Sequence, residues 1–103
     1  MLSHSVFFSL HDNSPAAIDH LVAACKTYLS GHPGTCFFAA GRLAAEYQRP
    51  VNDRTFDVAL HVVFSERADH DAYQQAPRHL KFIEANKANW KPVRVVDAWV
   101  EGK

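Results

Sequence analysis

Residues 72–82, A-Y-Q-Q-A-P-R-H-L-K-F, contain the break that organises the second half of the chain. Proline fixes φ at about −65° and has no backbone N–H, so it suits the first turn of a helix and not the interior. One helix is therefore predicted to end near Gln75 and another to begin at Pro77. His79 then lies in a first helical turn, where the helix dipole lowers the pKa of an imidazole. We expect His79 to point into a cavity.

Alternating apolar residues on each side of this break predict two β-strands. Residues 56–64, F-D-V-A-L-H-V-V-F, have one wholly apolar face, which consists of Phe56, Val58, Leu60, Val62 and Phe64. His61 lies on the opposite face. Residues 93–100, V-R-V-V-D-A-W-V, also alternate, and one face consists of Val93, Val95, Asp97 and Trp99. Asp97 is the one strongly polar residue on that face.

The first half of the chain also begins with an alternating segment. Residues 2–10 predict a strand whose apolar face is His4, Val6, Phe8 and Leu10. His4 is the one polar residue there. Residues 35–43 predict another strand, which is apolar on both faces and therefore expected to be covered on both. Gly41 is expected to mark a bulge or a close backbone approach, and residues 42–52 an exposed loop.

Capping signals locate the helices. Asn13 or Ser14 is expected to cap a helix that begins at Pro15 and ends before Gly31. Its predicted apolar stripe consists of Ile18, Leu21, Val22, Cys25, Tyr28 and Leu29. Ser65 is expected to cap the helix over residues 66–75. The helix from Pro77 is predicted to run to about Asn89, with a less regular stripe of Leu80, Ile83, Lys87 and Trp90.

The predicted order is β-α-β-β-α-β, which is the ferredoxin-like arrangement of the α+β class. A four-stranded antiparallel sheet then carries the helices on one face, within a single domain over residues 1–103. The open face keeps an apolar patch of Phe7, Val63, Val96, Ala98 and Val100. Exposed apolar patches mark partner surfaces, and twofold pairing is the commonest way to cover one. We expect a homodimer through the open sheet face.

Composition excludes several classes of partner. Eleven basic and eleven acidic side chains balance, so there is no electrostatic basis for binding nucleic acid or an anionic membrane. No apolar run approaches the roughly 20 residues that span a bilayer. The first ten residues lack the basic region of a signal peptide, and we expect a cytoplasmic protein. Cys25 and Cys36 are expected to be buried, reduced thiols.

The ordered motifs resemble a known family. They are an H-x-V-x-F strand, H-P-G followed by a strand ending in A-G-R, F-D-V-A-L-H-V-V-F, A-Y-x3-P-x-H and a closing V-V-D-x-x-V strand. Together they resemble the stress-responsive dimeric α+β-barrel domain family (Dabb) over nearly the whole chain. The resemblance implies that two sheets close into one barrel, with a pocket between each sheet and its helices.

The resemblance also implies site residues. A polyketide-cyclase member of the family uses a strand-one histidine, a tyrosine before the central proline and a histidine after it, which match His4, Tyr73 and His79. An aspartate on the last strand supports the first histidine and matches Asp97. This chain departs from the family pattern at Ala76, where the family commonly has a histidine.

Each candidate has a functional and a structural interpretation. His4 and Asp97 form either a general base with its supporting carboxylate or a buried pair that fixes the sheet register. His79 either moves a proton or packs on its helix, and Tyr73 either orients a carbonyl or packs its ring. The remaining histidines are expected at the dimer interface (His61) or in solvent (His11, His20, His32 and His70). Without a pair at metal-binding spacing, no metal site is expected.

Two functions follow from these interpretations. One is a cofactor-independent enzyme that acts on a small, largely apolar carbonyl compound, with His4 and His79 moving protons and Tyr73 orienting the substrate. The other is a non-catalytic small-molecule-binding or stress-associated structural dimer. The scaffold alone does not choose between them, because one fold hosts many activities.

Overall fold

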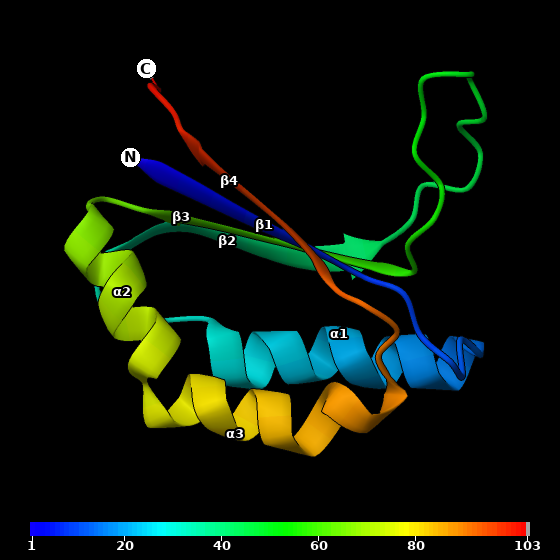
Figure 1. Cartoon of the computed structure of the whole chain (residues 1–103), viewed down its shortest axis with the longest axis horizontal. Helices are drawn as coiled ribbons and strands as arrows, with labels where there is room; N and C mark the ends of the chain where they lie inside the picture. Colours follow the sequence, from blue (N-terminus) through cyan, green and yellow to red (C-terminus); the bar gives the residue numbers. More distant parts are fainter. Residues whose placement is uncertain (103) are drawn as a thin grey trace.

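The computed structural model describes residues 1–102, and its elements follow the predicted order (Figure 1). The strands are β1 (Leu2–Phe8), β2 (Thr35–Arg42), β3 (Val58–Phe64) and β4 (Arg94–Trp99). The helices are α1 (Pro15–Leu29), α2 (Arg67–Gln75) and α3 (Pro77–Asn86), and a short 3₁₀ turn, Lys87–Asn89, follows α3. Pro77 begins α3, as its fixed φ predicts.

The four strands form one antiparallel sheet in the order β2-β3-β1-β4. The central strand β1 therefore pairs with both β3 and β4, and His4 lies opposite Val62 on one side and Asp97 on the other. The architecture is ferredoxin-like, as the sequence predicts. This topology brings the first and last strands together, which is why residues 93 positions apart can form one site.

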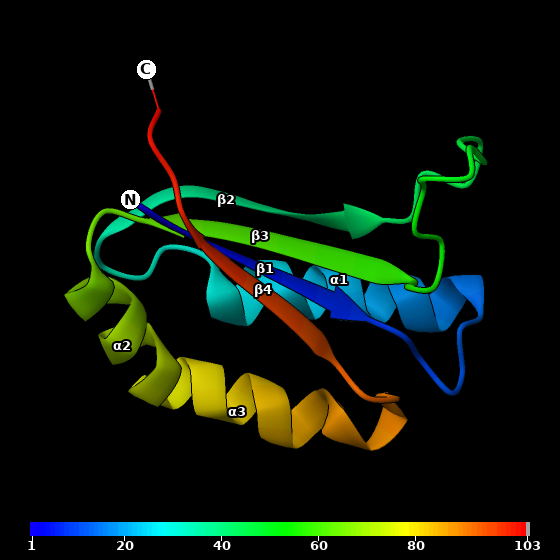
Figure 2. The same ribbon diagram turned by 45° about the horizontal axis from the view of Figure 1, so that its top comes forward.

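Helices α1 and α3 cover one face of the sheet and α2 lies at one end (Figure 2). The core fills the space between them, and the α1 stripe is confirmed: Leu21, Val22, Cys25 and Leu29 are buried. On the sheet side, the core consists of the alternate residues of β1 and β3 that are buried against the helices. Ser14 caps α1 by accepting a hydrogen bond from Ala17 N–H. None of the helices in the described residues has the length and apolarity needed to cross a membrane.

The predicted stripe of the last helix is partly right: Ile83 and Trp90 pack against the core, whereas Leu80 and Lys87 are exposed. Leu80 is half exposed, while His79, Phe82 and Asn86 are buried. The apolar pattern selected Leu80 because the buried face of α3 also carries two polar side chains, His79 and Asn86. Asn86 is satisfied internally, since its side-chain amide donates to Phe82 O at 2.8 Å. His79 has a different environment, described below.

Three local predictions are also corrected. The irregular pairing in β2 lies between Thr35 and Phe37, and Gly41 pairs regularly with Ala59. The cap of α2 is Glu66, whose N–H donates to the Asp69 carboxylate at 3.2 Å, and not Ser65. Cys36 is exposed, whereas Cys25 is buried as expected, and both are free thiols.

The sheet face away from the helices is open in the single chain. Phe37 on β2 and Val96 on β4 are 57% and 54% exposed. The prediction that β2 is covered on both faces is therefore wrong for the chain by itself. The predicted loop between β2 and β3 is exposed, and it projects beyond the end of the sheet (Figure 1).

Candidate functional site

A cavity of about 170 Å³ lies between the sheet and α3. Its wall is mainly apolar and includes Val6, Leu60, Phe82 and Trp90. Four polar side chains also line it: His4, Tyr73, Gln74 and His79. A mostly apolar cavity with a few convergent polar groups is the usual form of a small-molecule site, although pockets for drug-sized ligands are larger, at about 300–1,000 Å³.

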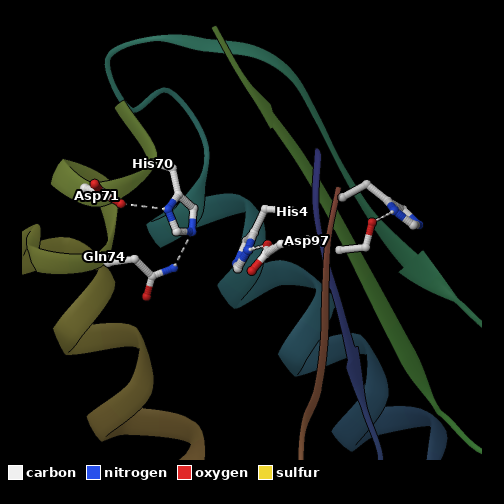
Figure 3. Close-up of polar contacts among 7 residues, drawn as sticks. His4, His70, Asp71, Gln74 and Asp97 are labelled. Atoms are coloured by element: carbon white, nitrogen blue, oxygen red, sulfur yellow. Dashed lines mark hydrogen bonds and ion pairs between the residues drawn. The ribbon is translucent and has the colours of Figure 1, made fainter. Parts of the chain in front are cut away.

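His4 and Asp97 form a hydrogen-bonded pair at one side of this cavity (Figure 3). They face each other across β1 and β4, and His4 Nδ1 lies 2.6 Å from Asp97 Oδ1. His4 is buried, with 5% of its surface exposed. Asp97 is half exposed because β4 is an outer strand. An ionised carboxylate only accepts hydrogen bonds, so His4 Nδ1–H donates and the Nε2 lone pair remains available.

Tyr73 on α2 and His79 on α3 lie on either side of the break between these helices, and their rings contact each other. Their ring centroids are 4.6 Å apart, and both residues are buried. Among residues 1–102, Tyr73 Oη and His79 Nδ1 have no hydrogen-bond partner. A buried polar group without a partner costs about 1–3 kcal/mol, so each of these atoms is available to a polar ligand.

Burial sets the protonation states of these two groups. It raises the pKa of Tyr73, so the phenol stays neutral and can donate a hydrogen bond. Burial is also the main cause that lowers the pKa of His79; the Gln74 backbone opposes this shift in part, and the neighbouring histidines His4, His32 and His70 lower the pKa further. The direction agrees with the sequence prediction, but its main cause is desolvation. His79 is therefore a neutral imidazole near pH 7.

The structure brings the four predicted site residues together. Tyr73 lies between the two histidines, with its ring centroid 6.0 Å from that of His4 and 4.6 Å from that of His79. His4, Tyr73 and His79 all line the one cavity, and Asp97 holds His4 from the strand beside it. His61 lies elsewhere, on the open face, where its Nδ1 is 3.0 Å from Ser5 Oγ.

Two histidines that were expected in solvent belong to this region. His70 packs edge-on against His4, with ring centroids 5.0 Å apart, and its side chain is only 17% exposed. His32 is buried against the Tyr73 ring at 5.0 Å, and its Nε2 lies 2.8 Å from Tyr28 O. The spacing of His70 and Tyr73, three residues apart on a helix, is the signal that could have placed His70 on the buried face.

Ala76 occupies the link between α2 and α3 and lines a second hollow beside Tyr73. His32 and Asp69 line the same hollow. A methyl group neither donates nor accepts a hydrogen bond, so Ala76 adds no polar group to this hollow or to the cavity between the sheet and α3. The imidazoles around Tyr73 therefore come from His4, His32 and His79.

A family model of the stress responsive A/B barrel domain matches residues 2–100. The chain belongs to the Dabb family. The match covers every strand and helix of the structure, including all four predicted site residues. No curated protein matches this sequence.

Solved structures similar to this Dabb chain share its fold at low sequence identity. A Dabb family protein with a ferredoxin-like fold from Mesorhizobium loti has a TM-score of 0.77 at 20% identity, covering 98% of this chain and 97% of that one. A dimeric ferredoxin-like protein of unknown function from Thermobifida fusca has a TM-score of 0.79 at 16% identity, covering 96% and 90%. Hydroxynitrile lyase from Passiflora edulis has a TM-score of 0.76 at 20% identity, covering 99% and 94%.

Proposed function

We propose that this Dabb chain is a cofactor-independent enzyme that transfers a proton on a small, largely apolar carbonyl compound. The observation that carries the proposal is a pair of buried atoms that have no hydrogen-bond partner in the described part of the chain, Tyr73 Oη and His79 Nδ1, in the same apolar cavity as His4, which Asp97 holds. A ligand oxygen that accepts from Tyr73 would remove the cost of an unpartnered group. The apolar wall favours a ligand with little other polarity.

Each residue has a distinct role in this reaction. His4 Nε2 takes a proton from the carbon next to the carbonyl, while Asp97 accepts from Nδ1–H and stabilises the imidazolium that forms. The electron pair of the broken C–H bond forms the C=C bond of the enolate, the π pair of the carbonyl moves to its oxygen, and Tyr73 O–H donates a hydrogen bond to that oxygen. His79 is the second proton-transfer group, because a neutral imidazole can accept or return a proton near neutral pH.

The proposal includes a homodimer formed through the open sheet face. Exposed apolar residues on that face, such as Phe37 and Val96, support it. Some proteins of similar fold are described as dimeric, including the one from Thermobifida fusca. Another protein of similar fold is a hydroxynitrile lyase, which gives a precedent for catalysis on this scaffold.

The decisive experiment starts from mass spectrometry of small molecules that copurify with the wild-type protein. Small, largely apolar carbonyl compounds of the kind that copurifies are then tested for turnover with wild type, His79→Ala and Tyr73→Phe. We expect turnover to be lost in His79→Ala while the melting temperature changes little, because in residues 1–102 His79 Nδ1 makes no hydrogen bond whose loss would destabilise the fold.

A matched control is His11→Ala, which removes an exposed imidazole outside the cavity. It should leave turnover unchanged. If a ligand binds but wild type does not convert it, the non-catalytic binding dimer is the correct function. A large fall in the melting temperature of His79→Ala would instead assign His79 a structural role.

A further inference from the structure

A second arrangement of donors lies beside the cavity. His4, His70 and Asp97 each offer one ligand atom, and these three atoms all lie within 4.8 Å of one another. They come from β1, α2 and β4, so the fold and not the sequence spacing brings them together (Figure 3). The pattern of two imidazoles and one carboxylate is common to non-haem metal centres.

The hydrogen bonds around His70 place its proton on Nδ1 and its lone pair on Nε2. His70 Nδ1 is 3.2 Å from Asp71 Oδ1, and Nδ1–H donates to this carboxylate. On the other side, the Gln74 side-chain amide nitrogen is 3.3 Å from His70 Nε2, which is the acceptor in that pair. A carboxylate behind the ring is the usual support of a metal-binding histidine, because it fixes the tautomer.

We propose that His4, His70 and Asp97 bind a divalent transition-metal ion of the Zn²⁺ type. Imidazole ligands select such ions over Mg²⁺ and Ca²⁺, which prefer oxygen. The ion enters between His4 Nδ1 and Asp97 Oδ1, and His70 Nε2 leaves the Gln74 amide to become the third ligand. This inference does not depend on the proposed function.

The required movements are small and fall on residues that can make them. Ligands bound at about 2.1 Å in a tetrahedron are roughly 3.4 Å apart. The His4–Asp97 pair must therefore open from 2.6 Å, and His70 must approach. His4 is fixed in the core, whereas Asp97 is half exposed on an outer strand and His70 is on the surface helix α2.

Two further observations point to a ligand at this place. The buried Tyr73 Oη and His79 Nδ1 line the same cavity as His4 and have no hydrogen-bond partner among residues 1–102, which leaves polar atoms free for a ligand next to His4. The side chains of Asp71 and Asp97 also supply negative charge that offsets the charge of the cation.

Metal binding and proton transfer exclude each other at His4. When the ion takes Nδ1, the single proton of the neutral ring moves to Nε2, which faces away from Asp97. Nε2 then has no lone pair to act as a base. We infer that the ion reversibly inhibits any reaction that uses His4 as the base.

The test is isothermal titration of the metal-free wild-type protein with ZnCl₂ near neutral pH, with MgCl₂ as the comparison. We expect one Zn²⁺ per chain and no measurable Mg²⁺ binding. His70→Gln and Asp97→Asn should each weaken Zn²⁺ binding at least about tenfold, and Asp71→Asn should have a smaller effect, because it acts through His70. Asp97→Asn is the safer variant for folding, since that side chain is half exposed.

His11→Gln and His20→Gln remove exposed imidazoles elsewhere and should leave the affinity unchanged. Thermal melting of each metal-free variant verifies that it is folded. Replacement of Zn²⁺ by Co²⁺ should give visible absorption bands that Asp97→Asn alters. Zn²⁺ affinity that is equal in wild type, His70→Gln and Asp97→Asn would mean adventitious surface binding and would overturn the proposal, as would Mg²⁺ binding of similar strength.

Discussion

The two faces of the sheet place similar residues in opposite environments. On the helix-covered face, His4 is buried and paired with Asp97, and Phe64 is fully buried. On the open face, His61 is exposed and pairs with Ser5, and Phe37 is 57% exposed. The covered face is packed against the helices and encloses a cavity. The open face has the composition of a core without the layer that would cover it.

This difference has a thermodynamic consequence. Burial stabilises the covered face within one chain, in proportion to the apolar area removed from water. The same residue types on the open face contribute to stability only when a second layer covers them. Substitutions on the two faces should therefore affect different equilibria, unfolding on one side and association on the other.

The largest expected effect is on the covered face. Phe64→Ala leaves a cavity beneath β3 in a rigid core, and the free energy of unfolding should fall by about 3–5 kcal/mol. The matched variant Phe37→Ala removes the same side chain from the open face. Measured at concentrations where the chain is monomeric, it should cost less than about 1 kcal/mol. Urea denaturation gives both values, and equal losses would contradict the difference between the faces.

The next effect is on association. Val96 is 54% exposed on the open face, so Val96→Lys should leave the folded chain nearly as stable as wild type. If two open faces pack together, the same lysine is buried without a partner, which costs several kcal/mol. Light scattering at micromolar concentration should give a dimer mass for wild type and a monomer mass for Val96→Lys. A monomer mass for wild type would disprove the proposed homodimer.

The sequence predictions succeed where a feature depends on local backbone geometry. Period-two alternation located the strands, and the proline and capping signals located the helices, because these patterns depend on local backbone geometry. The His4–Asp97 pair could be proposed because each is the one strongly polar residue on an apolar strand face. The ferredoxin-like order then places those two strands side by side.

Other features depend on packing that no local pattern records. The buried face of α3 includes His79 and Asn86, so a search for apolar residues selected Leu80 instead. His70 and His32 were assigned to solvent because polar residues in a helix or a turn are usually exposed. Their burial results from contact with His4 and Tyr73, which are distant in sequence.

The smallest effect concerns the pH dependence of stability on the covered face. Burial lowers the pKa of His79 in the folded chain relative to its usual value of 6.5. At a pH below about 6.5, the unfolded chain binds more protons at this residue than the folded chain does, so acid favours unfolding. The stability linked to His79 is complete above that pH. It is lost as the pH falls toward the lower pKa of the folded state and is constant below it.

His79→Gln should remove this component, because glutamine does not titrate. The difference in unfolding free energy between wild type and His79→Gln, measured by urea denaturation from pH 8 to pH 5, should therefore shift against wild type as the pH falls through about 6.5. His11→Gln, on an exposed turn, is the matched control and should give a constant difference. A constant difference for His79→Gln would mean that His79 titrates alike in both states, and its burial would then not control its protonation.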